Sequence, residues 1–455
     1  MKRALVVSYH FLPDQSVGAK RPTELVNSML AQGWHVTVLT RTHKTPLPDD
    51  EYQGPGTLEI VRAPHLPGIL NPSYNAFKRL IQAVGRAKKE DDRPDNEPVE
   101  KDSISPTLRG PVSFRFWLKR LVISGQAMLN ATKGWLVSSL ALLVVQKIKG
   151  KQFDVVISSS PPASVHFLAR FALILFGAKW ILDVRDPINM WELVVPECRA
   201  PYRVSFENWL ERSYLRKADQ IVVTTDPLKE EMEKIGERHR YEYAVTTVYN
   251  GFDGEIIPEP ATFIETAELA FAGNLYANRD PFPLLNAIKD LLKNRQIETG
   301  GIRFHLYGDC ETWSGYSLRE WVQKNSLEDT IIFHGMLPPD SLKTELRRAH
   351  LLVSYAQQQP LQIPAKTFDY LRYPCKSFVI TERASATGEF VVRNDVGYAS
   401  DDDPNRLKET LQLALKDLSL RKEVDLPQEE LVKRKSFSRS AQNRRYLELI
   451  EALNG

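Results

Sequence analysis

The sequence predicts an α/β protein of two or three domains, and three observations lead to this fold class. First, the chain has 455 residues, which is more than one compact hydrophobic core usually holds. Second, short continuous apolar segments, the pattern of buried parallel strands, alternate with longer segments expected to be helical. Third, the succession of strand, glycine-containing turn and helix that opens at Ala4 starts again at Leu269. We therefore expect two successive α/β units.

The composition is that of an ordinary globular protein. The net charge of +3 is small for this length and no nucleic-acid-binding module is recognisable, so no nucleic-acid partner is expected. The longest apolar run, Trp135 to Val145, is shorter than the roughly 18–20 residues that a membrane-spanning helix needs. Three distant cysteines without metal-ligand spacing indicate a reducing cytoplasm, and the first residues indicate a strand rather than a signal peptide.

The first half of the chain has the pattern of one α/β domain. Residues 4–9 form an apolar strand, a loop over 10–19 follows, and a helix is expected over 21–32. His10, at the strand end, either contacts a substrate or has a local role in this loop. Further elements are expected as strands at 35–40, 58–63, 153–158, 179–184 and 218–225, and as helices at 161–176, 206–217 and 226–236.

Two charged residues, Arg185 and Asp186, directly follow the strand at 179–184 and precede Pro187. Ligands of open α/β sheets bind at the carboxyl ends of the strands. This position favours a role in a binding site. The alternative is a local ion pair within a turn.

The segment between the third and fourth of these strands differs in composition from the rest. Residues 85–106 are rich in charge and proline, which predicts a mobile surface loop. Between Asp102 and Asp154 there is no acidic residue, and basic residues alternate with bulky apolar ones over 107–152. This pattern favours a surface that contacts anionic lipid headgroups. A pair of core helices with solvated ends is the alternative.

The second half begins with a strand at 269–272 and a turn containing Gly273 and Asn274, followed by Arg279 and a helix over 281–293. Two further strands end in glycine, at Gly308 and at Gly335, which follows His334. Strands are also expected at 351–355 and 376–381, and helices at 407–418 and 437–453.

The stretch from Gln362 to Leu371 carries the strongest functional signal. Pro364 is expected to open a helix, whose first N–H groups, beginning near Ala365, are free to bind an anion. Lys366 adds a cation, and Asp369, about one turn further on, is placed to accept hydrogen bonds from a ribose diol. These groups suit a nucleotide diphosphate. The alternative is an ordinary amphipathic helix with a Lys and an Asp on its solvated side.

The same stretch resembles a family motif. Its pattern, Pro364-x-Lys366-x-x-Asp369-Tyr370-Leu371, is similar to the P-x-K-x-x-E-Y-L donor-site helix of the retaining glycosyltransferases of family 4, which have the GT-B fold. Residues 250–253 resemble the P-N-G-V-D signature of this family, and residues 158–162 with 183–187 resemble one of its subgroups. The sequence departs from the pattern at Asp369, where the family usually has Glu, and at Leu361, where it has a second acidic residue.

The resemblance implies two Rossmann-like domains that face one another across a cleft. Residues 1–253 would bind the acceptor, 254–262 would be a linker, 263–436 would bind a nucleotide-sugar donor, and 437–455 would cross back to the first domain. The implied reaction is transfer of a sugar from a nucleotide diphosphate sugar to a hydroxyl of a glycan or lipid-linked acceptor, without a metal or other cofactor. Separately from the resemblance, the cysteine usage and the acid-free segment predict a cytoplasmic protein with peripheral contact with the inner face of an anionic membrane.

The resemblance also implies roles for individual residues. Arg279 and Lys366 would stabilise the leaving diphosphate, since Asn274 stands where the family has an Arg. Asp186 would orient the acceptor hydroxyl, with Arg185 keeping it ionised. The residues expected to contact donor or acceptor are Gly18, Arg21, His10, Gly273, Asn274, Gly308, His334, Gly335, Ala365 and Asp369. Two alternatives remain: a non-catalytic nucleotide-sugar-binding scaffold in a polysaccharide assembly complex, or another GT-B activity such as a nucleotide-sugar epimerase or hydrolase.

Overall fold

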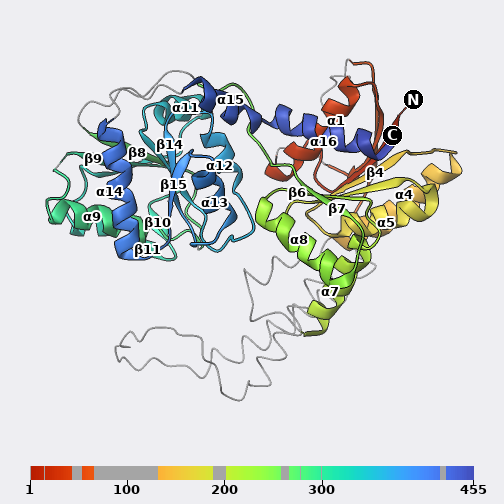
Figure 1. Ribbon diagram of the computed structural model, residues 1–455, viewed down its shortest axis with the longest axis horizontal. Coiled ribbons are helices and arrows are strands. Elements are labelled where there is room, and N and C mark those ends of the chain that lie inside the picture. Colours follow the sequence, from red (N-terminus) through yellow and green to blue (C-terminus); the bar gives the residue numbers. More distant parts are fainter. Residues whose placement is uncertain are drawn as a thin grey trace.

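The computed structural model describes residues 2–14, 16–43, 54–65, 132–187, 201–257, 266–276, 278–298, 300–420 and 427–454. These residues form two α/β domains, each built on a parallel sheet, that lie beside one another (Figure 1). The expected loop over 85–106 and most of the acid-free segment lie outside the described residues, as does much of the expected linker.

The first domain contains a seven-stranded parallel sheet with the order β3-β2-β1-β4-β5-β6-β7 among the described residues. The strand order reverses between β1 and β4, so a crevice is expected at their carboxyl ends. The strands are β1 (Arg3–Ser8), β2 (His35–Arg41), β3 (Thr57–Ala63), β4 (Val155–Ser159), β5 (Lys179–Val184), β6 (Gln220–Val223) and β7 (Ala244–Thr247).

Helices cover both faces of this sheet, which explains why its central strands are apolar without alternation. One face packs against α4 (Thr132–Ile148), α5 (Ser164–Phe176), α7 (Pro201–Leu215) and α8 (Asp226–His239). The other face packs against α1 (Val17–Ala31) and the last helix of the chain.

The second domain contains a six-stranded parallel sheet with the order β12-β9-β8-β13-β14-β15. Its order reverses between β8 and β13, in the same way as in the first sheet. The strands are β8 (Ala267–Ala272), β9 (Ile302–Tyr307), β12 (Ile331–Gly335), β13 (Leu351–Tyr355), β14 (Lys376–Ile380) and β15 (Gly397–Ser400). A hairpin of β10 (Thr312–Trp313) and β11 (Tyr316–Ser317) follows β9. The helices are α9 (Phe282–Lys293), α10 (Leu318–Lys324), α11 (Pro339–Arg347), α12 (Ala365–Tyr370), α13 (Ala386–Arg393), α14 (Pro404–Leu420) and α15 (Gln428–Ser436).

The last helix, α16 (Arg439–Asn454), crosses back to the first domain, as the blue ribbon in Figure 1 shows. Its Tyr446, Leu447 and Ile450 are buried in the core of the first domain. At its start, Arg439 donates hydrogen bonds to Asp253, with Nε and Oδ1 2.6 Å apart, and to the carbonyl of Asn250. The expected crossover helix is therefore present.

The start of one helix beside the candidate site differs from the sequence-based expectation. Helix α1 begins at Val17, four residues before Arg21, so Gly18 lies in its first turn and not in a loop. Helix α8 begins at Asp226, as expected, and is capped by Thr225, whose Oγ1 accepts a hydrogen bond from the N–H of Leu228. Among the described residues, no helix is long and apolar enough to span a membrane.

Candidate active site

Glycine turns at the carboxyl ends of three neighbouring strands form the base of the site in the second domain. Gly273 follows β8, Gly308 follows β9, and Gly335 is the last residue of β12. All three have positive φ, at +143°, +116° and +67°. The N–H of Gly308 donates to the carbonyl of Gly335 at 2.7 Å, and a Cβ on Gly308 would lie 2.3 Å from the carbonyl oxygen of Gly273. The three turns are in contact with one another, and at Gly308 only a glycine fits this packing.

Lys366 and Arg279 bring two positive charges to these turns. The Lys366 Nζ lies 4.1 Å from the centre of the Phe271 ring, and a Cβ on Gly273 would lie 2.3 Å from it. Burial, and then the nearby charge of Arg279, lower the pKa of Lys366 to about 7. Among the described residues, neither cation forms an ion pair with a carboxylate, and Arg279 Nε is buried without a partner. Two adjacent cations without a carboxylate in ion-pair contact are arranged for an anionic ligand.

Asn274 has a supporting role here. Its carbonyl accepts a hydrogen bond from Arg279 Nη1 at 3.1 Å, and its side-chain oxygen accepts one from the N–H of Asp309 at 3.3 Å. Asn274 thus holds Arg279 in place through the backbone, while its own side chain is bound to the neighbouring turn.

Helix α12 lies after β13, the other strand at the reversal point of this sheet. Pro364 precedes the helix as its N-cap residue and Ala365 is the first helical residue. Asp369 lies on its solvent-exposed side. Surrounding protein atoms raise the pKa of its carboxyl group, and the positive charges of Lys20 and Arg439 oppose this rise. Asp369 therefore faces the junction where α1 and α16 of the first domain meet the second domain.

His334 lies among polar and aromatic side chains on β8, β9 and β12. Its ring stacks on Tyr307 with centroids 4.5 Å apart, and its Nε2 is 2.9 Å from Nδ1 of His305. His305 is in turn 2.6 Å from Glu268. The imidazole is exposed, but these contacts hold it at the sheet, and the expectation that it contacts the donor or the acceptor stays a prediction.

In the first domain, Arg185 connects the carboxyl ends of β4 and β5 to the first turn of α1. Its Nε donates to the carbonyl of Ser160 and its Nη1 donates to the carbonyl of Gly18 at 2.7 Å. The Gly18 carbonyl is available because the residue four positions later in α1, Pro22, has no N–H. Arg185 is buried, and its Nη2 has no partner among the described residues. Two residues predicted to belong to the site, Gly18 and Arg185, are therefore in direct contact.

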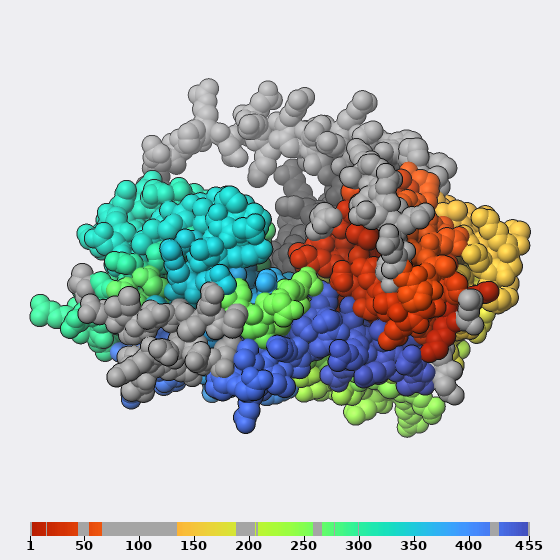
Figure 2. Space-filling view, turned by 90° about the horizontal axis from the view of Figure 1, so that it is seen from above, coloured from red at the N-terminus to blue at the C-terminus, as the bar shows by residue number. Residues whose placement is uncertain are grey.

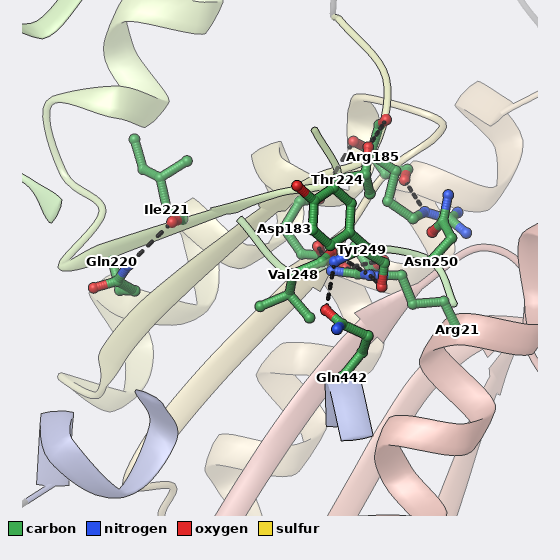
Figure 3. Close-up of polar contacts among 12 residues, drawn as sticks. Arg21, Asp183, Arg185, Gln220, Ile221, Thr224, Val248, Tyr249, Asn250 and Gln442 are labelled. Carbon is green, nitrogen blue, oxygen red and sulfur yellow. Dashed lines mark hydrogen bonds and ion pairs between the residues drawn. The ribbon is translucent and has the colours of Figure 1, made fainter. Parts of the chain in front are cut away.

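Arg21 lies inside the first domain (Figure 3). It forms a bidentate ion pair with Asp183, with Nε 3.2 Å from Oδ2 and Nη2 3.0 Å from Oδ1. Its Nη1 also donates to the carbonyls of Val248 and Tyr249, at 2.8 and 3.1 Å. Only 4% of Arg21 is exposed. These contacts assign Arg21 a structural role, and the geometry lends no support to the prediction that it contacts the substrate.

His10 is held by Asp14 in the loop after β1. The Nδ1 of His10 is 2.8 Å from Asp14 Oδ2, and Arg41 donates to the same oxygen at 2.8 Å. Burial alone would raise the pKa of Asp14, but hydrogen bonds from His10, Ser16 and Arg41 outweigh burial and hold this pKa well below its usual range. His10 also lies against Gly18, where an added Cβ would be 3.4 Å from the imidazole ring.

Asp186 meets the second domain directly. Gln362, in the loop before α12, donates a hydrogen bond from Nε2 to Asp186 Oδ1. Beside this contact, Thr225 Oγ1 donates to the carbonyl of Leu361 at 2.7 Å, and the Leu361 side chain packs against the core of the first domain. Burial raises the pKa of Asp186, while Arg185 and the hydrogen bond from Gln362 oppose the rise. Asp186 thus lies where the two domains touch.

Several residues of this arrangement were missed from the sequence. Gln362 belongs to the stretch that carried the strongest signal, but its partner is 176 positions away along the chain. Asp183 belongs to the motif that ends at Pro187, but it was not singled out as a site residue. Asp14 had a detectable signal, because it lies four residues after His10 in the loop that follows a buried strand.

The chain has two parallel-sheet domains, and the strand order of each sheet reverses once. Solved structures share this fold. Sucrose-phosphate synthase from Thermosynechococcus elongatus has a TM-score of 0.60 at 15% identity, covering 100% of this chain and 99% of that chain. α,α-Trehalose 6-phosphate synthase from Burkholderia multivorans has a TM-score of 0.56 at 11% identity, with 100% and 99% covered. Anabaena HepE, solved with UDP-glucose, has a TM-score of 0.53 at 10% identity, with 99% and 100% covered. The chain has the GT-B fold.

The family follows from the sequence profile of the glycosyl transferase 4-like domain, which matches residues 18–251, more than half of the chain. The protein belongs to this family of glycosyltransferases. A comparison with curated proteins found no match to the sequence. The expected resemblance to family 4 and the expected GT-B fold are therefore confirmed.

Proposed function

We propose that this protein transfers a sugar from a nucleotide diphosphate sugar to a hydroxyl of a glycan or lipid-linked acceptor, with retention of the anomeric configuration. The observation that carries the proposal is the pair of cations, Lys366 and Arg279, without a carboxylate partner at the glycine turns of the second domain. A diphosphate supplies the missing negative charge, and the glycines let it approach the backbone. Family membership and the UDP-glucose bound to HepE support a nucleotide-sugar donor.

The chemistry follows from where charge develops. As the bond to the sugar breaks, negative charge grows on the leaving diphosphate, and Lys366 and Arg279 stabilise it. This stabilisation is proposed to replace a metal ion. The departing phosphate oxygen takes the proton of the attacking hydroxyl, so the enzyme needs chiefly to hold that hydroxyl about 3–3.5 Å from the anomeric carbon. Asp186, with Arg185 beside it, is the proposed orienting group.

The acceptor is proposed to be a glycan or lipid-linked molecule on the cytoplasmic face of a membrane, with the enzyme peripheral to that membrane. A non-catalytic donor-binding scaffold is the second candidate. Its support is the loop before α12, where Leu361, at the position of the second family acid, is packed against the first domain and offers no carboxylate.

The experiment that tests the proposal has two stages. Thermal shift measurements with a panel of nucleotide sugars identify the donor, because a ligand that binds the folded state raises the melting temperature. Turnover of that donor is then measured with and without a lipid-linked acceptor. Acceptor-dependent release of nucleotide diphosphate supports transfer, hydrolysis without acceptor supports a hydrolase, conversion to another nucleotide sugar supports an epimerase, and binding without turnover supports a scaffold.

Asp369→Ala is expected to weaken binding of the donor by about 1.5–3 kcal/mol, the usual size for hydrogen bonds to a charged group. The physical reason is the loss of the carboxylate proposed to accept from the ribose diol. Calorimetric titration of the folded variant measures the effect. Asp395→Ala, another exposed acid of the second domain, is the control and should bind the donor normally. An unchanged dissociation constant for the Asp369 variant removes the ribose role.

Asp186→Asn is expected to lower turnover by roughly 10²-fold while donor affinity stays intact, within the range for positioned catalytic groups. Asparagine keeps an oxygen that accepts from Gln362 and removes the charge. Gln362→Ala is the matched control, since it removes the contact between the domains and leaves the carboxylate. If Gln362→Ala loses turnover and Asp186→Asn does not, the contact and not the charge is what matters. Near-normal turnover with a lower melting temperature for Asp186→Asn indicates a structural role and makes His10 the next candidate.

A further inference from the structure

Helix α4 exposes an apolar face to solvent. Val137, Val144 and Ile148 are 57%, 39% and 79% exposed, and Ala141 lies in the same row. At 3.6 residues per turn, these positions form one stripe along the helix. The opposite side of α4 carries Trp135 and Leu143, which are buried against the sheet. A surface helix normally places polar residues where α4 has this stripe.

Helix α5, which packs beside α4, repeats this arrangement. Phe167 and Ile174 are 40% and 73% exposed, and both lie on the side opposite the buried Val165, Leu168 and Ala172. Both helices cover the same face of the first sheet. They are the yellow elements in Figure 1, and in Figure 2 the yellow surface forms the end of the molecule that lies away from the second domain. We call the outward sides of α4 and α5, with residues 137, 141, 144, 148, 167 and 174, the α4–α5 surface.

The charged side chains on these two helices have one sign. Neither helix contains an Asp or a Glu, whereas Lys147, Lys149 and Arg170 lie on or directly after them. The nearby ion pairs, Lys151 with Glu59 and Lys179 with Asp219, place their acids on β3 and in the loop before β6, outside both helices. The α4–α5 surface is thus apolar with basic residues beside it.

We propose that the α4–α5 surface binds the headgroup region of an anionic lipid bilayer. Exposed apolar side chains enter the boundary between headgroups and acyl chains, while neighbouring Lys and Arg side chains attract anionic lipids. A second copy of this chain is a poorer fit, because a symmetric contact would bring the same cations together. A nucleic acid would use the cations and leave the apolar stripe in water.

The position of this surface relates it to the candidate active site, and this step rests on the proposed function. Near the start of α4, Trp135 touches Tyr9 with ring centroids 5.1 Å apart, and Ser138 donates to the carbonyl of Pro64, just after β3, at 2.6 Å. Helix α5 starts directly after the turn at the end of β4 that contains Ser160, a partner of Arg185. Both helices begin at the edge of the sheet that carries the acceptor half of the site. The most exposed apolar residues, Ile148 and Ile174, and the cations Lys147 and Lys149 lie at the other ends of the helices. The bilayer would therefore lie along both helices, and a lipid-linked acceptor would approach the site from the helix starts.

The test is flotation of the full-length protein with vesicles of neutral phosphatidylcholine, alone or mixed with anionic phosphatidylglycerol. We expect binding to the mixed vesicles that weakens with salt. Each Lys near such a surface contributes about fivefold to partitioning, so Lys147→Gln with Lys149→Gln should weaken binding about 25-fold. Val144→Gln with Ile148→Gln and Ile174→Gln should weaken it by about tenfold or more. The control is Val392→Gln with Val432→Gln, two residues of the second domain that are each 60% exposed, and it should bind like the wild type.

Three outcomes overturn the proposal: no binding of the wild type to anionic vesicles at low salt, equal loss in the control variant, or self-association without vesicles that the α4–α5 substitutions abolish. The last identifies the surface as an interface between copies. The proposed function is judged separately, by turnover with a water-soluble acceptor. Variants that no longer bind vesicles but retain turnover with the water-soluble acceptor support both proposals. A wild-type protein that binds vesicles without turning over any donor contradicts the proposed function alone.

Discussion

Replacing Lys366 by alanine is expected to lower turnover by about 10²–10³-fold, and to weaken donor binding less than this. The size is that of removing a group that stabilises developing charge in the transition state. Lys366 is partly buried beside the Gly273 turn, where its charge acts over a short distance in surroundings with little water. Arg279→Ala is expected to show the same imbalance between turnover and binding. Steady-state kinetics with calorimetric titration of the donor separates the two quantities.

The charge state of Lys366 supplies an independent readout of the same prediction. Because its pKa is lowered to about 7, the free enzyme carries the Lys366 charge below about pH 7 and loses it above. The value of kcat/KM for the donor, which reports the free enzyme, is therefore expected to fall as the pH rises through about 7. Lys366→Arg keeps its charge at all these pH values, so its profile should lack this fall. An alanine variant that loses binding alone, with normal turnover at saturating donor, contradicts the proposed role.

Replacing Arg21 by methionine is expected to reduce the free energy of unfolding by about 3–5 kcal/mol, the cost of removing one partner from a buried ion pair. Asp183 would lose its buried ion-pair partner and keep Ser159 Oγ as a donor at 2.7 Å, and the carbonyls of Val248 and Tyr249 would each lose a donor. Denaturant-induced unfolding measures the effect. Turnover per folded molecule should be close to normal.

The control for this substitution is Arg303→Met, which breaks the ion pair between Arg303 and Glu268. The Arg303 side chain is 48% exposed. Exposed pairs contribute about 1 kcal/mol or less, so this variant should be almost as stable as the wild type. If Arg21→Met instead keeps its stability and loses turnover, the substrate contact predicted from the sequence is correct and the structural role is wrong.

Much of the donor half of the site was predictable because it depends on short stretches of chain. Parallel strands place their carboxyl ends at one edge of the sheet, so glycines directly after the strands, such as Gly273 and Gly308, fall at the same edge. Lys366 is tied to the same edge by the short connection from β13. The direction in which Lys366 and Arg279 point, and the lowered pKa of Lys366, depend on burial, which a linear pattern does not report.

The acceptor half was less predictable, because its contacts join distant parts of the chain. Gly18 and Arg185 lie 167 positions apart, and their contact requires both a helix that starts earlier than expected and a proline that frees a carbonyl. A buried Arg such as Arg21 and a substrate-binding Arg look identical in a sequence, and only the position of Asp183 distinguishes them.

The sequence by itself determined the two α/β units, the order of their strands along the chain and the chemistry of the residues proposed to bind the donor, since periodicity and strand-end glycines are local properties. The tertiary structure alone decided which charges are paired and which remain available to a ligand. It also decided that Asp186 meets Gln362 across the domains, and that the apolar stripes of α4 and α5 face outward. The physical reason is that ion pairing, burial and exposure depend on the packing of segments that are far apart in the chain, to which no local pattern refers.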